Sequence, residues 1–267
     1  MDREGHCQET LALIGGYDPL TLSRIVEEKV TKPSLEGQLR RYYRFRPTRF
    51  YGGIFTADAV GCNLRCIFCW SFRHVVNMEL GRFYSPKEVA KILIDGARRR
   101  GFSKVRVSGA EPTIGRGHLI ELIEELEGSG LLFILETNAI LLSDKNYARD
   151  LARDHIHVRV SLKGTTPEQF SKLTGAKEEG FFLQLEGLRN LLESGASVHV
   201  SAVISFSKEE EVSQLLERLR ELDPTLVRDF EPELVVLYPS VRERLRKARI
   251  TPEIAVMPDG SLVSGKI

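Results

Sequence analysis

Six short apolar segments, rich in β-branched or aromatic residues, alternate along the chain with segments of helical periodicity. The apolar segments are predicted strands, and they span residues 54–60, 104–109, 131–136, 156–163, 197–205 and 233–238. The segments between them carry apolar residues three and four positions apart with charges opposite, and are predicted helices at 85–100, 118–127, 144–154, 181–193 and 208–222. This alternation predicts parallel strands joined by right-handed crossovers.

Serine–glutamate pairs mark the beginnings of two predicted helices. Ser85 is followed by a proline and then by Glu88, which is the pattern of a capping box with proline at the first helical position. Ser207 and Glu210 repeat the same spacing. The two pairs predict helix starts just after these serines.

The two faces of the predicted strands differ in polarity. This difference distinguishes between a doubly wound sheet, a closed eight-stranded barrel and a partial, open barrel. In strand 156–163 one face carries only valine and leucine, whereas the other carries His157, Arg159, Ser161 and Lys163. A doubly wound sheet needs two apolar faces, because helices cover both. A closed eight-stranded barrel is filled mainly with branched apolar side chains. The pattern therefore predicts a partial (β/α)6 TIM-type barrel of parallel strands with a polar cleft and an N-terminal extension.

The elements divide the chain into three predicted parts. Residues 1–50 are a helical and basic N-terminal extension that adds no strand to the series, and residues 51–239 are the barrel core. Residues 240–267 are a C-terminal helix and hairpin tail, because a Pro-Asp-Gly sequence at 258–260 separates two short alternating runs.

Composition narrows the classes of function. Hydrophobic residues make up 42% of the 267 residues and charged residues 28%, which is typical of a soluble, packed protein. The formal net charge of +1 excludes a global attraction to nucleic acid or to a membrane. No apolar run is long enough to cross a bilayer and the N-terminus is polar, so we expect a cytoplasmic protein without membrane contact. Three of the four cysteines are crowded together, which in a reducing compartment indicates metal binding.

Cys62, Cys66 and Cys69 form a C-x3-C-x2-C pattern directly after the first predicted strand. Their loop therefore lies at the C-terminal end of that strand, where the active sites of parallel β/α folds gather. Three thiolates at these spacings can hold three corners of an iron–sulfur cube and leave one iron open, as catalytic metal sites do. The alternative is a zinc site completed by His74, although structural zinc ligands usually come as two separated pairs.

This cysteine pattern, with the aromatic Phe68 before the third cysteine, resembles the signature of the radical S-adenosylmethionine (SAM) superfamily. The resemblance implies a [4Fe–4S] cluster ligated by Cys62, Cys66 and Cys69, with the open iron chelated by the amino and carboxylate groups of SAM. It also implies an enzyme that cleaves SAM reductively to methionine and a 5′-deoxyadenosyl radical, which abstracts hydrogen from a substrate. A ferredoxin or flavodoxin is the expected electron donor.

A second motif follows the next predicted strand. Ser108-Gly109-Ala110-Glu111 resembles the Gly-Gly-Glu motif that holds the SAM amino group in this superfamily, with alanine in place of the second glycine. The added methyl group restricts the backbone at that position. An ordinary turn between a strand and a helix is the alternative.

Three further residues are SAM contacts by resemblance. Asn138 lies in a Thr-Asn turn after the third predicted strand, and Ser161 and Lys163 lie at the end of the fourth. Residues at such positions contact the ribose or the carboxylate of SAM. The alternatives are plain turn chemistry and a solvated lysine.

Other side chains have possible roles near the site. The ring of Trp70 would either shield the cluster from water or pack in the core, and Cys7 is expected to be a free thiol. Arg106 and Arg159 point to the cleft side of their strands, where together with Lys163 they could bind substrate anions.

The substrate is not determined by these motifs. Compact size and the lack of a cysteine-rich C-terminal extension resemble the activating enzymes of glycyl-radical proteins, which favours a partner protein. The Cys-Ile-Phe-Cys-Trp string is similar to the radical enzymes that build the wybutosine tricycle on transfer RNA, but their second cluster needs more upstream cysteines than this chain has. A small molecule is the remaining option.

Residues 40–51 interleave arginines with aromatic residues, a mixture that suits phosphate contacts and base stacking on a nucleic acid. We favour the alternative, a lead-in strand against the barrel with its arginines facing water. A different class of function would be a non-catalytic iron–sulfur or zinc protein that serves as a structural or sensor module.

Overall fold

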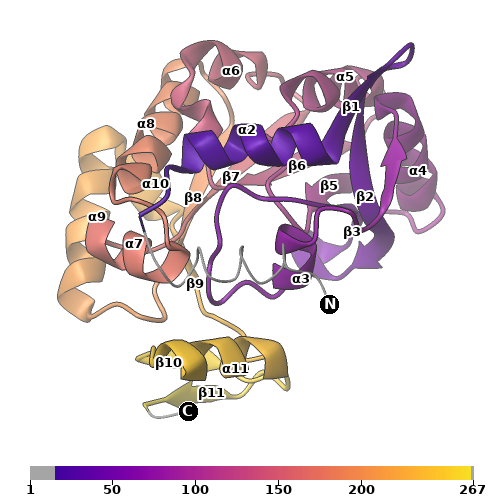
Figure 1. The fold of residues 1–267 in the computed structure, drawn as a ribbon. Helices are drawn as coiled ribbons and strands as arrows, with labels where there is room; N and C mark the ends of the chain where they lie inside the picture. Colours follow the sequence, from indigo (N-terminus) through magenta and orange to yellow (C-terminus); the bar gives the residue numbers. More distant parts are fainter. Residues whose placement is uncertain (1–15, 266–267) are drawn as a thin grey trace.

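Six parallel strands form the centre of the structure, a computed structural model that describes residues 16–265 (Figure 1). In spatial order they are β3 (Ile54–Ala59), β5 (Lys104–Ser108), β6 (Leu132–Thr137), β7 (Ile156–Leu162), β8 (Val198–Val203) and β9 (Glu231–Glu233). Their order in space equals their order in sequence, and every neighbouring pair is parallel. The predicted partial (β/α)6 barrel is confirmed.

Helices cover the outer face of this sheet (Figure 1). They are α4 (Pro86–Arg98), α5 (Arg116–Leu126), α6 (Lys145–Asp150), α7 (Pro167–Thr174), α8 (Glu179–Glu193), α9 (Glu209–Leu222) and α10 (Pro224–Arg228), with the 3₁₀ turn η2 (Ile140–Ser143) before α6. The outward residues Val158, Val160 and Leu162 of β7 are fully buried in the core that the strands and helices share. The apolar face therefore drives helix packing, and the polar face is left for the barrel interior.

The N-terminal part extends the sheet. Helix α2 (Pro19–Val30) leads into β1 (Thr31–Ser34) and β2 (Gly37–Thr48), and β2 pairs antiparallel with β3 and with the short strand β4 (Arg82–Tyr84). The 3₁₀ turn η1 (Phe50–Gly52) links β2 to β3. Strand β1 was not predicted, whereas β2 corresponds to the lead-in strand expected within residues 40–51, and its pairing with β3 crosses the expected boundary at residue 50. The division into three parts stays a prediction.

Two local predictions were wrong, each because a distant contact outweighs the local pattern. The sixth strand lies at Glu231–Glu233 and not at 233–238, since Val235 and Leu237 leave the sheet and pack in a separate small apolar cluster. The cap of α9 is not Ser207 with Glu210. The Lys208 N–H donates to the Glu211 carboxylate at 2.7 Å, while the Ser207 hydroxyl bonds to Thr165 and Gln169. The Ser85–Glu88 capping box is confirmed, with both of its hydrogen bonds formed.

The C-terminal part contains α11 (Pro239–Ala248) and an antiparallel hairpin of β10 (Ile254–Val256) and β11 (Leu262–Ser264), as predicted. Val241 and Leu245 of α11 pack with Val203 at the end of β8. In Figure 1 this part lies beside the open end of the barrel, below β9. Between residues 16 and 265, no helix combines the length and apolar character needed to span a bilayer.

Candidate functional site

The cysteine loop begins directly after β3, at the edge where the parallel strands have their C-terminal ends. Gly61 opens it with φ +84°, and a Cβ there would lie 2.6 Å from Val26 Cγ1 and 2.8 Å from Val30 Cγ1 of α2. Only glycine therefore allows the chain to turn at this point so close to the helix. The Gly61 N–H donates to the His74 carbonyl, which lies in α3 (Phe72–Val76), and the Gly61 carbonyl accepts from the Glu111 N–H.

Cys62, Cys66 and Cys69 are free thiols; Cys66 is buried and the other two are half-buried. Burial raises the pKa of all three, that of Cys62 to about 12. The positive charge of Lys163 opposes this rise of the pKa for Cys66 and Cys69. Thiolates are the form that binds iron, so this pocket holds its ligands protonated until a cation replaces the protons.

The donor set fits an iron–sulfur cluster better than a single ion. Across residues 16–265 no three histidine, cysteine, aspartate or glutamate side chains converge closely enough to hold one metal ion, so the zinc alternative gains no support. Three thiols on one loop can reach separate iron corners of a cube. Two buried donors of the same loop, Asn63 Nδ2 and Arg65 Nη2, have no hydrogen-bond partner in the described chain, which indicates a missing acceptor beside the thiols.

The Gly-Ala-Glu motif after β5 lies against this loop. Gly109 has φ +84°, and a Cβ there would come within 3.1 Å of both Tyr43 Oη and Asp58 Cβ. Ser108, Gly109 and Ala110 are half-buried at the end of the strand. This stretch of backbone is therefore open enough to contact a ligand, while Glu111 beyond it is 2% exposed.

The Glu111 carboxylate accepts four hydrogen bonds within the protein. Oε1 accepts from Thr113 N at 3.1 Å, Thr113 Oγ1 at 2.7 Å and Thr137 Oγ1 at 2.6 Å, and Oε2 accepts from Asn138 N at 2.8 Å. Three of these bonds converge on Oε1 and one reaches Oε2, so within the described chain Oε2 keeps one acceptor site. Glu111 therefore holds the β5 and β6 loops together.

Asn138 connects the β6 turn to the cysteine loop. Its Nδ2 donates to Asn63 Oδ1 at 2.7 Å, and its carbonyl accepts from Gln184 Nε2 at 2.7 Å. Gln184, a buried residue of α8, also accepts from the Lys163 N–H at 3.2 Å. The predicted residues Asn138 and Lys163 are thus brought to the same edge as the cysteines. The side chains of Asn63 and Gln184 connect these residues through hydrogen bonds. The sequence did not predict this connecting role, because nothing in the local sequence marks a buried amide on a loop or in a helix as a link between distant residues.

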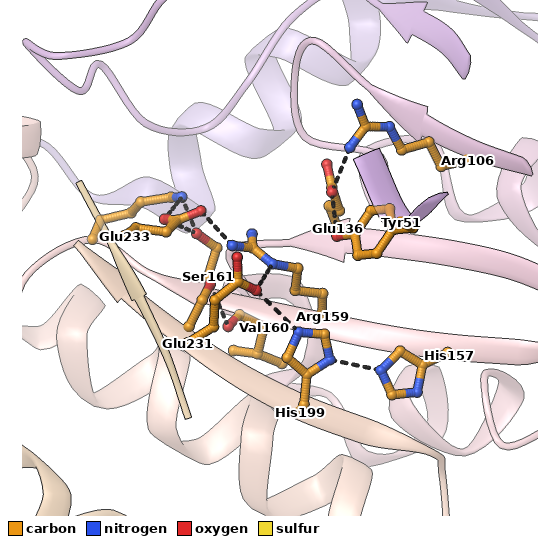
Figure 2. A network of polar contacts seen from close by, with 12 residues as sticks. Tyr51, Arg106, Glu136, His157, Arg159, Val160, Ser161, His199, Glu231 and Glu233 are labelled. Atoms are coloured by element: carbon orange, nitrogen blue, oxygen red, sulfur yellow. Dashed lines mark hydrogen bonds and ion pairs between the residues drawn. The ribbon is translucent and has the colours of Figure 1, made fainter. Parts of the chain in front are cut away.

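Ser161 and Lys163 belong to a polar network inside the barrel, and Figure 2 shows Ser161 with Glu233 and Arg159 of this network. Lys163 Nζ donates to Ser161 Oγ at 2.5 Å, and Ser161 Oγ donates to Glu233 Oε2 at 2.8 Å. Arg159 Nη2 donates to the other oxygen of Glu233 at 2.7 Å, and Arg159 Nε donates to Glu231 at 2.8 Å. The Glu231 pKa falls to about 2, because His199 and Arg159 both donate hydrogen bonds to it.

Arg106 is also paired inside the barrel. Its Nη1 donates to Glu136 Oε1 at 2.6 Å, and Tyr51 donates to the same oxygen at 2.7 Å (Figure 2). Because Arg106 and Arg159 are both buried and matched with internal carboxylates, neither offers an unpaired charge to an anion. The expectation that these two arginines bind substrate anions finds no support in this geometry.

The arginine-rich stretch forms β2, as the favoured alternative predicted, but its arginines do not simply face water. Arg40 is 1% exposed and donates to the Glu111 carbonyl at 2.8 Å. Arg44 and Arg46 both donate to the buried carboxylate of Asp58, each at 2.7 Å. Two cations thus share one anion, and one positive charge is left in excess on the cleft side of β2.

Aromatic rings lie beside these arginines. Trp70 is 48% exposed, so it does not pack in the core; the Arg46 guanidinium lies 5.9 Å from its ring centre. Phe50 is 63% exposed, with Arg106 at 5.0 Å from its ring centre. Phe68 packs instead against Phe206, with ring centres 5.9 Å apart. The exposed rings of Trp70 and Phe50 therefore each lie beside an arginine, and the arginine beside Trp70 shares its carboxylate with Arg44.

Helix α11 holds the C-terminal half of the cysteine loop through Arg244. Arg244 donates from Nε to the Ile67 carbonyl at 2.9 Å and from Nη2 to the Cys69 carbonyl. Earlier in the loop, the Arg65 N–H donates to Tyr17 Oη at 2.9 Å. Neither contact was predicted, because each joins segments far apart in the sequence. Cys7 lies outside the described residues.

Comparisons with known proteins agree with this geometry. The family model described as the radical SAM superfamily matches residues 58–220, which is more than half of the chain. A probable GTP 3′,8-cyclase of Saccharolobus islandicus is 27% identical over 229 residues, covering 76% of this chain and 70% of the relative. One from Methanococcus maripaludis is 36% identical over 115 residues, covering 42% of this chain and 37% of the relative.

Solved structures share the fold. SuiB of Streptococcus suis, solved with SAM and with its precursor peptide SuiA, aligns with a TM-score of 0.51 at 19% identity over 76% of this chain. The match spans 57% of SuiB. A mutant of spore photoproduct lyase aligns with a TM-score of 0.57 at 14% identity, covering 80% of this chain and 66% of that protein. From the family match, together with its cysteine loop and barrel, the chain belongs to the radical SAM superfamily.

Proposed function

We propose that this chain binds one [4Fe–4S] cluster through Cys62, Cys66 and Cys69 and uses it to cleave SAM. The observation that carries the proposal is the placement of three free thiols on a single loop at the C-terminal edge of the barrel. When bound, the cluster would supply the electron that cleaves SAM to methionine and a 5′-deoxyadenosyl radical. The electron donor is proposed to be a ferredoxin or a flavodoxin.

The protein's own residues form the SAM site in this proposal. The open backbone at Ser108, Gly109 and Ala110 would accept the SAM amino group, and Glu111 would position it by holding Thr137 and Asn138 in place. Ser161 and Lys163, which are hydrogen-bonded to each other at the C-terminal end of β7, would face the ribose or the carboxylate. Phe68 would pack beside the cluster.

For the substrate we propose a nucleotide. Arg44 and Arg46 share one carboxylate, and exposed Trp70 lies beside them, so positive charge and a stacking surface meet on the cleft side of β2. Phosphate groups and bases use this pair of contacts. The relatives named as probable GTP 3′,8-cyclases favour the same class. Activation of a glycyl-radical protein, which the sequence favoured, gains no support from the relatives described above.

The cleavage half of this proposal is tested by product release. Protein purified without oxygen is mixed with SAM and dithionite, and 5′-deoxyadenosine is quantified by chromatography. Wild type and Cys7→Ser should release it, and Cys66→Ser should not. Release by Cys66→Ser at the wild-type rate, or none by wild type that holds iron, would refute the proposal.

The substrate half is tested by isotope transfer. Nucleoside triphosphates with a deuterated ribose, GTP among them, are added to the same reaction, and deuterium in 5′-deoxyadenosine is measured by mass spectrometry. We expect transfer from at least one nucleotide, and Arg46→Met should raise its KM about tenfold while the exposed Arg49→Met leaves it unchanged. Absence of transfer from every nucleotide, with transfer from a peptide instead, would contradict a nucleotide substrate.

A further inference from the structure

A buried cation lies inside the cysteine loop, and no carboxylate of the described chain forms an ion pair with it. Arg65 is 2% exposed, and its Nη1 donates to the carbonyls of Cys62 and Leu64 at 2.5 and 3.1 Å. Its Nη2 is buried and has no hydrogen-bond partner in residues 16–265. Tyr17, whose hydroxyl accepts from the Arg65 N–H, and Cys62, whose carbonyl accepts from Nη1, lie beside it.

Asn63, two residues earlier, repeats the arrangement with a neutral donor. It is fully buried, and its Oδ1 accepts from Asn138, but its Nδ2 has no partner in the described chain. An uncompensated buried charge costs several kcal/mol, and buried donors in folded proteins are almost always paired. Two such donors on the loop of the three thiols indicate that an acceptor belongs beside this loop.

An unpaired nitrogen is not sufficient by itself to indicate a ligand. Arg40 also has two buried nitrogens without partners, but it lies beneath the Gly-Ala-Glu motif and faces Glu111 and tyrosines. Arg65 differs because it is hydrogen-bonded inside the loop of the three cysteines, and no carboxylate of residues 16–265 forms an ion pair with it. An anionic group bound by this loop would therefore lie next to an uncompensated positive charge.

We infer that Arg65 is the counter-ion of the cluster, and that together with Asn63 Nδ2 it raises the reduction potential of the cluster. The inference rests on the proposed function. A [4Fe–4S] cluster held by three thiolates is anionic, and hydrogen bonds and nearby charge set its potential. Reduction transfers one electron from the donor, a flavodoxin or dithionite, without a proton, so the cluster gains one negative charge and Arg65 stabilises the reduced form more than the oxidised form.

The expected effect is large enough to measure. A unit charge at about 7 Å, in a medium with an effective dielectric constant of about 20, changes a one-electron equilibrium by more than tenfold. Arg65→Met keeps most of the side-chain volume and removes the charge. It should lower the reduction equilibrium constant at least about tenfold, which is a fall in potential of about 59 mV or more for one electron. Asn63→Leu, which removes only the neutral donor, should lower it less.

The test is an anaerobic redox titration of the loaded full-length protein without SAM, followed by electron paramagnetic resonance (EPR). Arg65→Lys should stay close to wild type because it keeps the charge, and Arg73→Met, at an exposed position of α3, is the matched control. Equal potentials in Arg65→Met and wild type would overturn the inference. Wild type without any cluster would instead overturn the proposed function.

A second measurement covers the case in which Arg65→Met holds no iron. Loss of the cluster with unchanged or increased stability of the apo chain in urea supports the inference, because the uncompensated buried charge is gone. Arg65→Lys must then still bind the cluster. Equal destabilisation of apo Arg65→Met and apo Arg65→Lys would show that Arg65 only holds the loop through its carbonyl contacts, and the inference would fail.

Discussion

Replacing Glu111 with glutamine separates a positioning role from direct contact with SAM. The carboxylate accepts four hydrogen bonds, three at Oε1 and one at Oε2. In the variant the amide oxygen can take the place of only one of these atoms. With oxygen at the Oε1 position, the amide NH₂ faces the N–H of Asn138, so two donors oppose each other and that N–H is left unpaired.

The loss of stability expected for Glu111→Gln follows from these contacts. A hydrogen bond to a charged group contributes about 1.5–3 kcal/mol, and leaving a buried donor unpaired costs about 1–3 kcal/mol. Burying a neutral amide costs less desolvation free energy than burying a carboxylate, which offsets part of the lost stability. We expect the free energy of unfolding to fall by about 2–3 kcal/mol, which for a chain of this size lowers Tm by roughly 5–10 °C.

The assay is urea unfolding of the apo protein without SAM, with the exposed Glu125→Gln on α5 as control. The control should change stability by less than about 0.5 kcal/mol. Unchanged stability of Glu111→Gln, combined with a large loss of SAM affinity in the loaded protein, would refute the positioning role. It would show that the carboxylate acts on SAM directly.

Two further predictions concern the stability of the framework around the site. Gly61→Ala should lower the free energy of unfolding by about 2–4 kcal/mol in urea, because its Cβ would lie 2.6 and 2.8 Å from the valines of α2. The control Gly195→Ala has a similar φ of +77° but open space around the Cβ, so it should lower the free energy of unfolding by only about 1 kcal/mol. Equal losses in the two variants would contradict the steric argument. Burial lowers the pKa of His118 to about 3, below its value of about 6.5 in the unfolded chain, so the unfolded chain binds the proton at a higher pH than the folded protein does. The free energy of unfolding should therefore fall by about 1.4 kcal/mol per pH unit as the pH drops from 6.5 towards 3. His118→Asn should flatten the pH dependence of unfolding between pH 6.5 and 5, and a slope identical to that of wild type would contradict the assignment.

Local sequence patterns were sufficient for the barrel and for the cysteine loop. The one-sided polarity of β7 predicted a polar interior, and the structure fills that interior with Arg159, Ser161 and their carboxylate partners. Strand alternation and the cysteine spacing are short-range features, so they can be read without knowing the fold.

The remaining features depend on contacts between distant segments. Strand β2 carries arginines whose partners, Asp58 and the Glu111 carbonyl, appear only when it pairs with β3. The sixth strand was placed on the apolar residues after Glu233, because a strand of inward carboxylates is recognisable only once Arg159 faces it. The roles of Glu111 and Arg65 also depend on burial, which periodicity does not report.

The central claim is that three thiolates hold the cluster and one iron is left for SAM. The most direct measurement is the EPR spectrum of the dithionite-reduced wild-type protein, recorded before and after the addition of SAM. A [4Fe–4S] signal that changes on addition of SAM is predicted, because the ligand environment of the open iron changes. A [4Fe–4S] signal that SAM leaves unaltered, or protein without iron, would contradict the account.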